Sequence, residues 1–70
     1  MRYVYDYNTH AARFYILNGY AYGMEGQQAH FWIRNSYWYP VSGIRSQAEY
    51  WEKDQFIYGM STSDAAFYFA

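Results

Sequence analysis

The sequence predicts an α+β domain: a small antiparallel sheet of four or five hairpin-connected strands with one short helix near residues 46–54. Three observations lead to this fold class. Aromatic and β-branched runs recur along the chain, short turn dipeptides separate them, and a helix-capping pattern begins at Ser46. The 70 residues fit a single domain, 1–70, whose core is of marginal size.

The first strand is expected near residues 3–7, where apolar and polar residues alternate. Alternation sends successive side chains to opposite faces. Tyr3, Tyr5 and Tyr7 would therefore share one face, and Val4 and Asp6 the other.

Residues 13–24 predict a hairpin around Asn18-Gly19, because this dipeptide accepts the positive φ angles of a type I′ turn. Leu17 would lie opposite Tyr20, and Ile16 opposite Ala21. An alternative remains open, in which a helix over residues 10–18 replaces the first strand of this hairpin and ends at Gly19.

Residues 29–41 predict a second hairpin, with a weaker turn at Asn35-Ser36. This pairing would place Trp32 opposite Tyr39. Pro40 has no N–H to donate to a ladder, so its strand should lie at an edge or end there.

The last third of the chain predicts the helix and a short strand. Ser46 and Glu49 have the spacing of a capping box, which would start a helix running to about Lys53. Residues 55–58 would form a strand, and residues 65–70 a last helical turn. We find no internal repeat in the sequence.

Composition excludes several classes of protein. There is no cysteine, so neither a disulfide framework nor a thiolate metal site can form. The net charge of −1 does not suit a protein that neutralises the phosphates of duplex DNA. The chain has no run of 18 apolar residues and no apolar signal-peptide core, so we expect a cytoplasmic protein that does not span a membrane.

No motif points to catalysis. His10 and His30 lie far apart and lack the spacing of metal ligands, the serine-nucleophile elbow is absent, and the glycines do not form a phosphate-binding loop. We expect a non-enzymatic protein with no catalytic residues, no cofactor and no metal site.

The aromatic content predicts a binding surface. Aromatic residues make up 27% of the chain and charged residues only 16%. A core this small cannot hold all of the aromatic side chains, and Tyr, Trp and Arg dominate binding hot spots. The predicted binding residues are Trp32, Arg34, Tyr37, Tyr39, Tyr3, Tyr5 and Tyr7.

We therefore expect the chain to bind a larger protein or assembly, as a small inhibitor or accessory subunit. Two alternatives stay open. Aromatic side chains interleaved with arginines could stack on single-stranded nucleic acid. Strand-rich edges of low charge could also add further copies of the chain, giving a homo-oligomer or a structural subunit.

Overall fold

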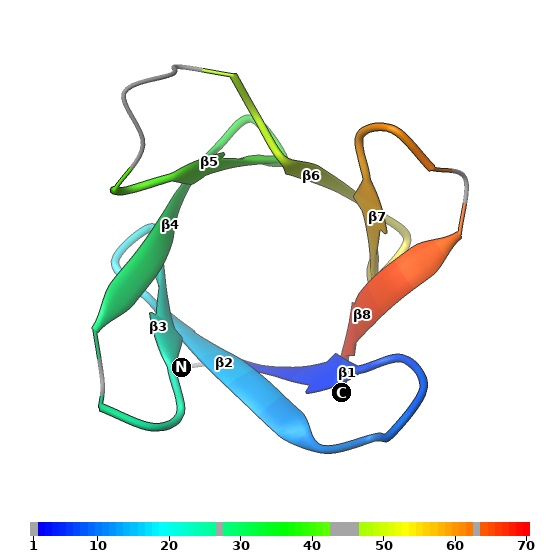
Figure 1. Ribbon diagram of the computed structural model, residues 1–70, viewed down its shortest axis with the longest axis horizontal. Helices are drawn as coiled ribbons and strands as arrows, with labels where there is room; N and C mark the ends of the chain where they lie inside the picture. Colours follow the sequence, from blue (N-terminus) through cyan, green and yellow to red (C-terminus); the bar gives the residue numbers. More distant parts are fainter. Residues whose placement is uncertain (1, 27, 43–46, 63) are drawn as a thin grey trace.

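The computed structural model describes residues 2–26, 28–42, 47–62 and 64–70, which form eight antiparallel strands closed into a barrel. Each strand pairs with its neighbours in sequence, and the last strand pairs with the first (Figure 1). The strands are β1 (Arg2–Asp6), β2 (Ala12–Leu17), β3 (Tyr20–Gly23), β4 (Ala29–Arg34), β5 (Tyr37–Pro40), β6 (Tyr50–Lys53), β7 (Phe56–Gly59) and β8 (Ala65–Phe69).

The predicted α+β class is wrong. The described residues contain no helix, and the sheet has eight strands rather than four or five. The helix predicted near residues 46–54 is replaced by β6, although Ser46, its capping residue, lies outside the described residues. The alternative helix over 10–18 and the helical turn over 65–70 are likewise replaced, by β2 and β8.

Tertiary pairing overrides the helical signals. A capping residue contributes about 1 kcal/mol. Residues 50–53 instead pair with β5 on one side and β7 on the other. Alternation then sends Tyr50 and Glu52 inward and Trp51 and Lys53 outward, a two-faced pattern that suits a barrel wall.

Both predicted hairpins are confirmed. Asn18-Gly19 joins β2 to β3, and Asn35-Ser36 joins β4 to β5, in the predicted register. A third hairpin, β6–β7, turns at Asp54-Gln55. The central residues of all three turns have positive φ, between 53° and 82°, as a type I′ turn requires. Pro40 ends its strand, in accord with the prediction.

The barrel is a fourfold internal repeat, contrary to the sequence analysis. Three of the repeats are the hairpins β2–β3, β4–β5 and β6–β7. The fourth is the pair of β8 and β1, which no turn connects, and we count it as the fourth hairpin. Figure 1 shows them around the ring, with the longer connections at four corners. Equivalent inward-facing cross-strand pairs are Ile16–Ala21, Ile33–Trp38, Glu52–Ile57 and Phe69–Val4.

The hydrogen bonds between hairpins repeat as well. The second turn residue of one hairpin accepts a bond from the next, as Gly19 O does from Ile33 N at 2.8 Å and Ser36 O from Glu52 N at 2.9 Å. We call the end of the barrel that carries these turns the turn end. The opposite end, where β1 leads to β2, β3 to β4, β5 to β6 and β7 to β8, is the loop end.

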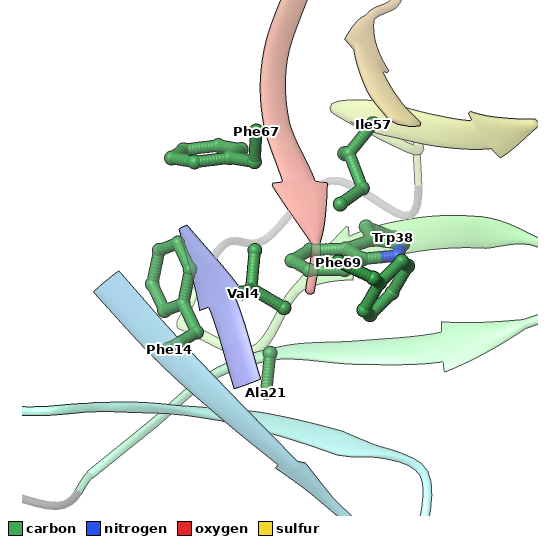
Figure 2. Packing of buried hydrophobic residues seen from close by; sticks show 7 residues of the cluster. All are labelled: Val4, Phe14, Ala21, Trp38, Ile57, Phe67 and Phe69. Atoms are coloured by element: carbon green, nitrogen blue, oxygen red, sulfur yellow. The ribbon is translucent and has the colours of Figure 1, made fainter. Parts of the chain in front are cut away.

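The core lies on the barrel axis and draws on all four hairpins. Val4, Ala21, Trp38 and Ile57 are completely buried. Figure 2 shows them with Phe14, Phe67 and Phe69, which complete the buried cluster. One large indole opposite small and branched side chains fills a narrow barrel, because interiors pack at near-crystalline density.

Candidate binding surface

The outer face of the barrel carries an aromatic belt. Alternation along every strand sends the residues between the core positions outward. We define the belt as the outward-facing aromatic residues of the eight strands: Tyr3, Tyr5, Tyr15, Tyr20, Tyr22, Trp32, Tyr37, Tyr39, Trp51, Phe56, Tyr58 and Tyr68. Each hairpin contributes three of them, at equivalent positions.

Each hairpin stacks one belt pair across its strands. The closest pair is Trp32–Tyr39, whose ring centroids are 4.3 Å apart with 16° between the planes. The equivalent pairs are Trp51–Tyr58 at 4.9 Å, Tyr15–Tyr22 at 5.2 Å and Tyr5–Tyr68 at 5.6 Å. Cross-strand stacking stabilises the hairpins and presents the outer ring faces and edges to solvent.

The third belt residue is more exposed: it directly follows the turn in the three connected hairpins, and Tyr3 holds the equivalent position on β1. Tyr3, Tyr20 and Tyr37 are 42–44% exposed, and Phe56 is 37% exposed. These residues contribute little to the core, so their aromatic character is not explained by burial alone.

The predicted binding residues fall on opposite sides of the barrel. Trp32, Arg34, Tyr37 and Tyr39 lie together on the β4–β5 hairpin. Tyr3 and Tyr5 lie on β1, which is four strands away from β5 in either direction around the ring (Figure 1). The structure therefore separates the predicted site into two faces.

The face over β7, β8 and β1 contains an aromatic depression. It has a volume of about 580 Å³ and is lined by Tyr7, His10, Phe56 and Tyr68. The Tyr7 ring packs edge-on against Phe56 and Tyr68, at 6.0 and 6.5 Å. His10 Nδ1 lies 2.9 Å from the Tyr68 hydroxyl, so the polar tips of the two side chains are paired with each other.

The loop between β1 and β2 positions His10. Asp6 Oδ1 accepts hydrogen bonds from Asn8 N and Thr9 N, at 2.8 and 3.0 Å, which orders an Asx-type turn. His10 N then donates to Asp6 O at 2.9 Å, and His10 itself adopts a φ of 64°. A left-handed residue in this loop turns the imidazole toward β8.

Asp6 also holds this loop through an ion pair. Its Oδ2 lies 2.8 Å from Arg13 Nη1 in an ion pair. The N–H groups of Thr9 and Asn8, and then Arg13, lower the pKa of Asp6 below its ordinary value of 3.8. The carboxylate is therefore charged wherever the protein is folded near neutral pH.

The face over β4 and β5 is the second candidate surface. Arg34, which is exposed, pairs across the hairpin with Tyr37. A smaller depression of about 430 Å³ lies on this side of the barrel, lined by Tyr37, Tyr39, Gln47, Ala48 and Met60. None of these lining residues is charged, which suits an apolar contact with a polar rim.

Sequence reasoning missed Phe56 and Tyr68 as surface residues, and it did not place His10, expected as a polar surface or rim residue, beside them. Phe56 was expected only as part of a short strand, and Tyr68 as part of an apolar helical turn. The signal that identifies them is the fourfold repeat: Phe56 follows its turn as Tyr20 and Tyr37 follow theirs, and Tyr68 matches Trp32.

The two histidines contact different aromatic side chains. Among the described residues, no three His, Asp or Glu side chains gather closely enough to hold a metal ion. His10 is paired with Tyr68, while His30 packs against Phe14 at the loop end. The described part of the chain forms no helix long and apolar enough to cross a membrane.

No protein-family profile, curated sequence or solved structure matches this chain.

Proposed function

We propose that the chain is a non-enzymatic binding domain that docks on a larger protein or assembly through its aromatic belt, as a small inhibitor or accessory subunit. The observation that carries the proposal is the exposure of aromatic rings at equivalent positions of four hairpins. Side chains of this kind combine an apolar ring with a polar tip, which suits a protein interface.

The face over β7, β8 and β1 is the preferred contact surface. Its depression is bordered by three aromatic rings and one imidazole. A partner that inserts an apolar side chain there would desolvate these rings, and buried aromatic anchors supply most of the free energy of typical interfaces. The few charges nearby favour shape and apolar contact over electrostatic attraction.

The closed barrel limits how copies of the chain could associate with one another. In the described structure both ladders of every strand are occupied, so no edge strand is available for another copy to extend the sheet. A homo-oligomer would therefore have to form through the belt. The nucleic-acid alternative rests on arginines interleaved with aromatic residues, such as Arg34 beside Tyr37, and Lys53 beside Phe56 adds a second basic group at the turn end.

The test compares two faces with a matched control. Tagged protein is used to capture partners from lysate of the source cell, with and without nuclease, and captured proteins are then purified and titrated. The three double variants are Tyr7→Ser with Phe56→Ser, Tyr37→Ser with Tyr39→Ser, and the control Leu17→Ser with Tyr20→Ser, which lies on the β2–β3 hairpin.

We expect the wild type to capture a protein in stoichiometric amount both with and without nuclease. That protein should bind the Tyr7→Ser, Phe56→Ser variant at least about tenfold more weakly than it binds the control variant, a loss of about 1.4 kcal/mol of binding free energy. Each variant must keep the wild-type circular dichroism spectrum. Equal binding by all three variants would rule out both faces. Recovery of nucleic acid, with affinity falling steeply as salt rises, would support the stacking alternative instead.

A further inference from the structure

Four aromatic rings close the loop end of the barrel. Phe14, Phe31, Tyr50 and Phe67 come from the four hairpins and pack edge to face in a continuous circuit. The centroid distances around it are 5.7, 5.5, 5.4 and 5.3 Å. The circuit forms an apolar floor facing the loops, separate from the outer belt.

A cavity of about 640 Å³ lies over this floor. Ala11, Ala12 and Met24 extend its apolar wall, and Arg13, Glu25 and His30 supply its polar groups. The volume is within the range of small-molecule sites, which are mostly apolar with a few convergent polar groups.

Arg13 and His30 converge on one wall of the cavity. Arg13 Cζ lies 5.9 Å from the centre of the Phe14 ring and 5.6 Å from that of Phe67. The His30 ring centre lies 5.8 Å from that of Phe14. Both side chains therefore flank the same phenyl ring, with hydrogen-bond donors beside an apolar surface.

The structural repeat explains why these two residues point into the cavity. The ladder shifts register beside each of them, where β2 and β4 carry one extra residue. The extra residues are Arg13 and His30, and their carbonyl oxygens accept equivalent bonds from Met24 N and Val41 N, at 3.2 and 3.0 Å. A β-bulge redirects a side chain in this way at the rim of a barrel.

The absence of a side chain at Gly23 makes room for the His30 ring. A Cβ atom at Gly23 would lie 2.7 Å from His30 Nε2 and 3.0 Å from its Cδ2. Any other residue would therefore displace the imidazole from the cavity wall.

Arg13 has donors left for a ligand. Asp6 engages Nη1, and the side chain remains 49% exposed. A guanidinium carries five N–H donors in a planar fork that matches a carboxylate. Glu25 also lines the cavity and Asp6 already pairs with Arg13, which disfavours a polyanion, so a ligand carboxylate depends on the remaining N–H donors of Arg13 rather than on an excess of positive charge.

We propose that the loop end of the barrel binds a small monocarboxylate with an aromatic or aliphatic body. The carboxylate pairs with Arg13 and accepts a hydrogen bond from His30, and the apolar body lies on the floor of Phe14, Phe31, Tyr50 and Phe67. This site is independent of the belt and of the protein partner proposed above.

The test titrates the protein with 3-phenylpropanoate and with its neutral amide, followed by chemical-shift changes in two-dimensional amide NMR spectra. We expect saturable shifts at Arg13, Gly23 and His30, with the acid binding at least about tenfold more tightly than the amide. Arg13→Gln should abolish this preference, while the control Arg34→Gln, at the turn end, should keep it.

A second variant is needed because Arg13→Gln also removes the ion pair with Asp6, which holds the loop. Ala12→Leu fills the cavity without removing a polar group, and should weaken both probes while leaving Arg13 in place. Equal binding of acid and amide to the wild type would overturn the proposal, as would shifts confined to the belt or unchanged binding to Ala12→Leu.

Discussion

Trp38, the largest fully buried side chain of the barrel, donates a hydrogen bond from Nε1 to Oε1 of Glu52 at 3.0 Å. Glu52 occupies the inward position that Ile16, Ile33 and Phe69 hold in the other hairpins. A polar side chain stands at this one equivalent position because the indole needs an acceptor inside the wall.

Removing this acceptor should destabilise the barrel. Glu52→Ala leaves the indole N–H buried without a partner, which costs about 1–3 kcal/mol of unfolding free energy. Glu52→Gln keeps an oxygen in the same place and should cost clearly less. Urea unfolding followed by circular dichroism measures both. Equal losses in the two variants would show that the charge of Glu52, rather than its acceptor role, matters.

Ser36→Gly should stabilise the protein. Ser36 has a φ of 69°, in the left-handed region that side chains with a Cβ adopt at a cost of about 1 kcal/mol. Glycine removes that cost, so we expect a gain of several tenths of a kcal/mol or more in urea unfolding.

Gly19→Ala is the matched opposite of this change. Gly19 holds the same turn position, has a φ of 82° and would place a Cβ with no atom within 4 Å. Backbone strain alone should then lower stability by about 1 kcal/mol. A neutral Gly19→Ala together with a destabilising Ser36→Gly would contradict the strain argument.

The sequence alone predicts the local hairpins and misses their closure. Asn18-Gly19 and Asn35-Ser36 determine a turn type and register from neighbouring residues. The pairing of β1 with β8 joins residues from opposite ends of the chain, and no local pattern encodes it. The repeat escaped notice because its equivalent residues differ: the floor position holds Phe14, Phe31, Tyr50 and Phe67.

The sequence predicts exposed aromatic side chains but not their arrangement. A small core cannot hold all of the aromatic residues, and Tyr3, Tyr20 and Tyr37 are exposed, whereas Trp32 and Trp51 are half-buried. Their division between opposite faces depends on the order of strands around the ring. The bulges that place Arg13 and His30 at the loop end arise from tertiary pairing and have no short-range signature.

Trp32 and Tyr39 should show a measurable coupling energy. Their stacked rings are the closest pair of the belt, and such aromatic pairs contribute about 0.5–1.5 kcal/mol beyond the area they bury. A double-mutant cycle of Trp32→Ala and Tyr39→Ala, read by urea unfolding, should give a coupling in that range.

A separated pair provides the control for this cycle. Trp32 and Tyr58 lie on β4 and β7, three strands apart. The losses of unfolding free energy in Trp32→Ala and Tyr58→Ala should therefore add to the loss in the double variant within about 0.5 kcal/mol. Additive behaviour of Trp32 and Tyr39 as well would mean that their stacking contributes nothing to stability.

Replacing Asp6 by Asn should change how stability depends on pH. The folded state lowers the pKa of Asp6, chiefly through the Thr9 N–H and then through the Asn8 N–H and Arg13. Below the ordinary value of 3.8 the unfolded chain therefore binds more protons than the folded chain. The stability due to this carboxylate is present at neutral pH and is lost as pH falls through the folded-state pKa.

Asp6→Asn keeps an oxygen for the Asn8 and Thr9 N–H groups but cannot take up a proton. We expect the variant to be less stable than the wild type near about pH 7 and to approach it near about pH 2, in urea midpoints measured across that range. Arg13→Gln should retain most of the wild-type pH dependence, because the two N–H groups act more strongly on the pKa of Asp6 than Arg13 does. Loss of that dependence in Arg13→Gln would instead identify the ion pair as its main source.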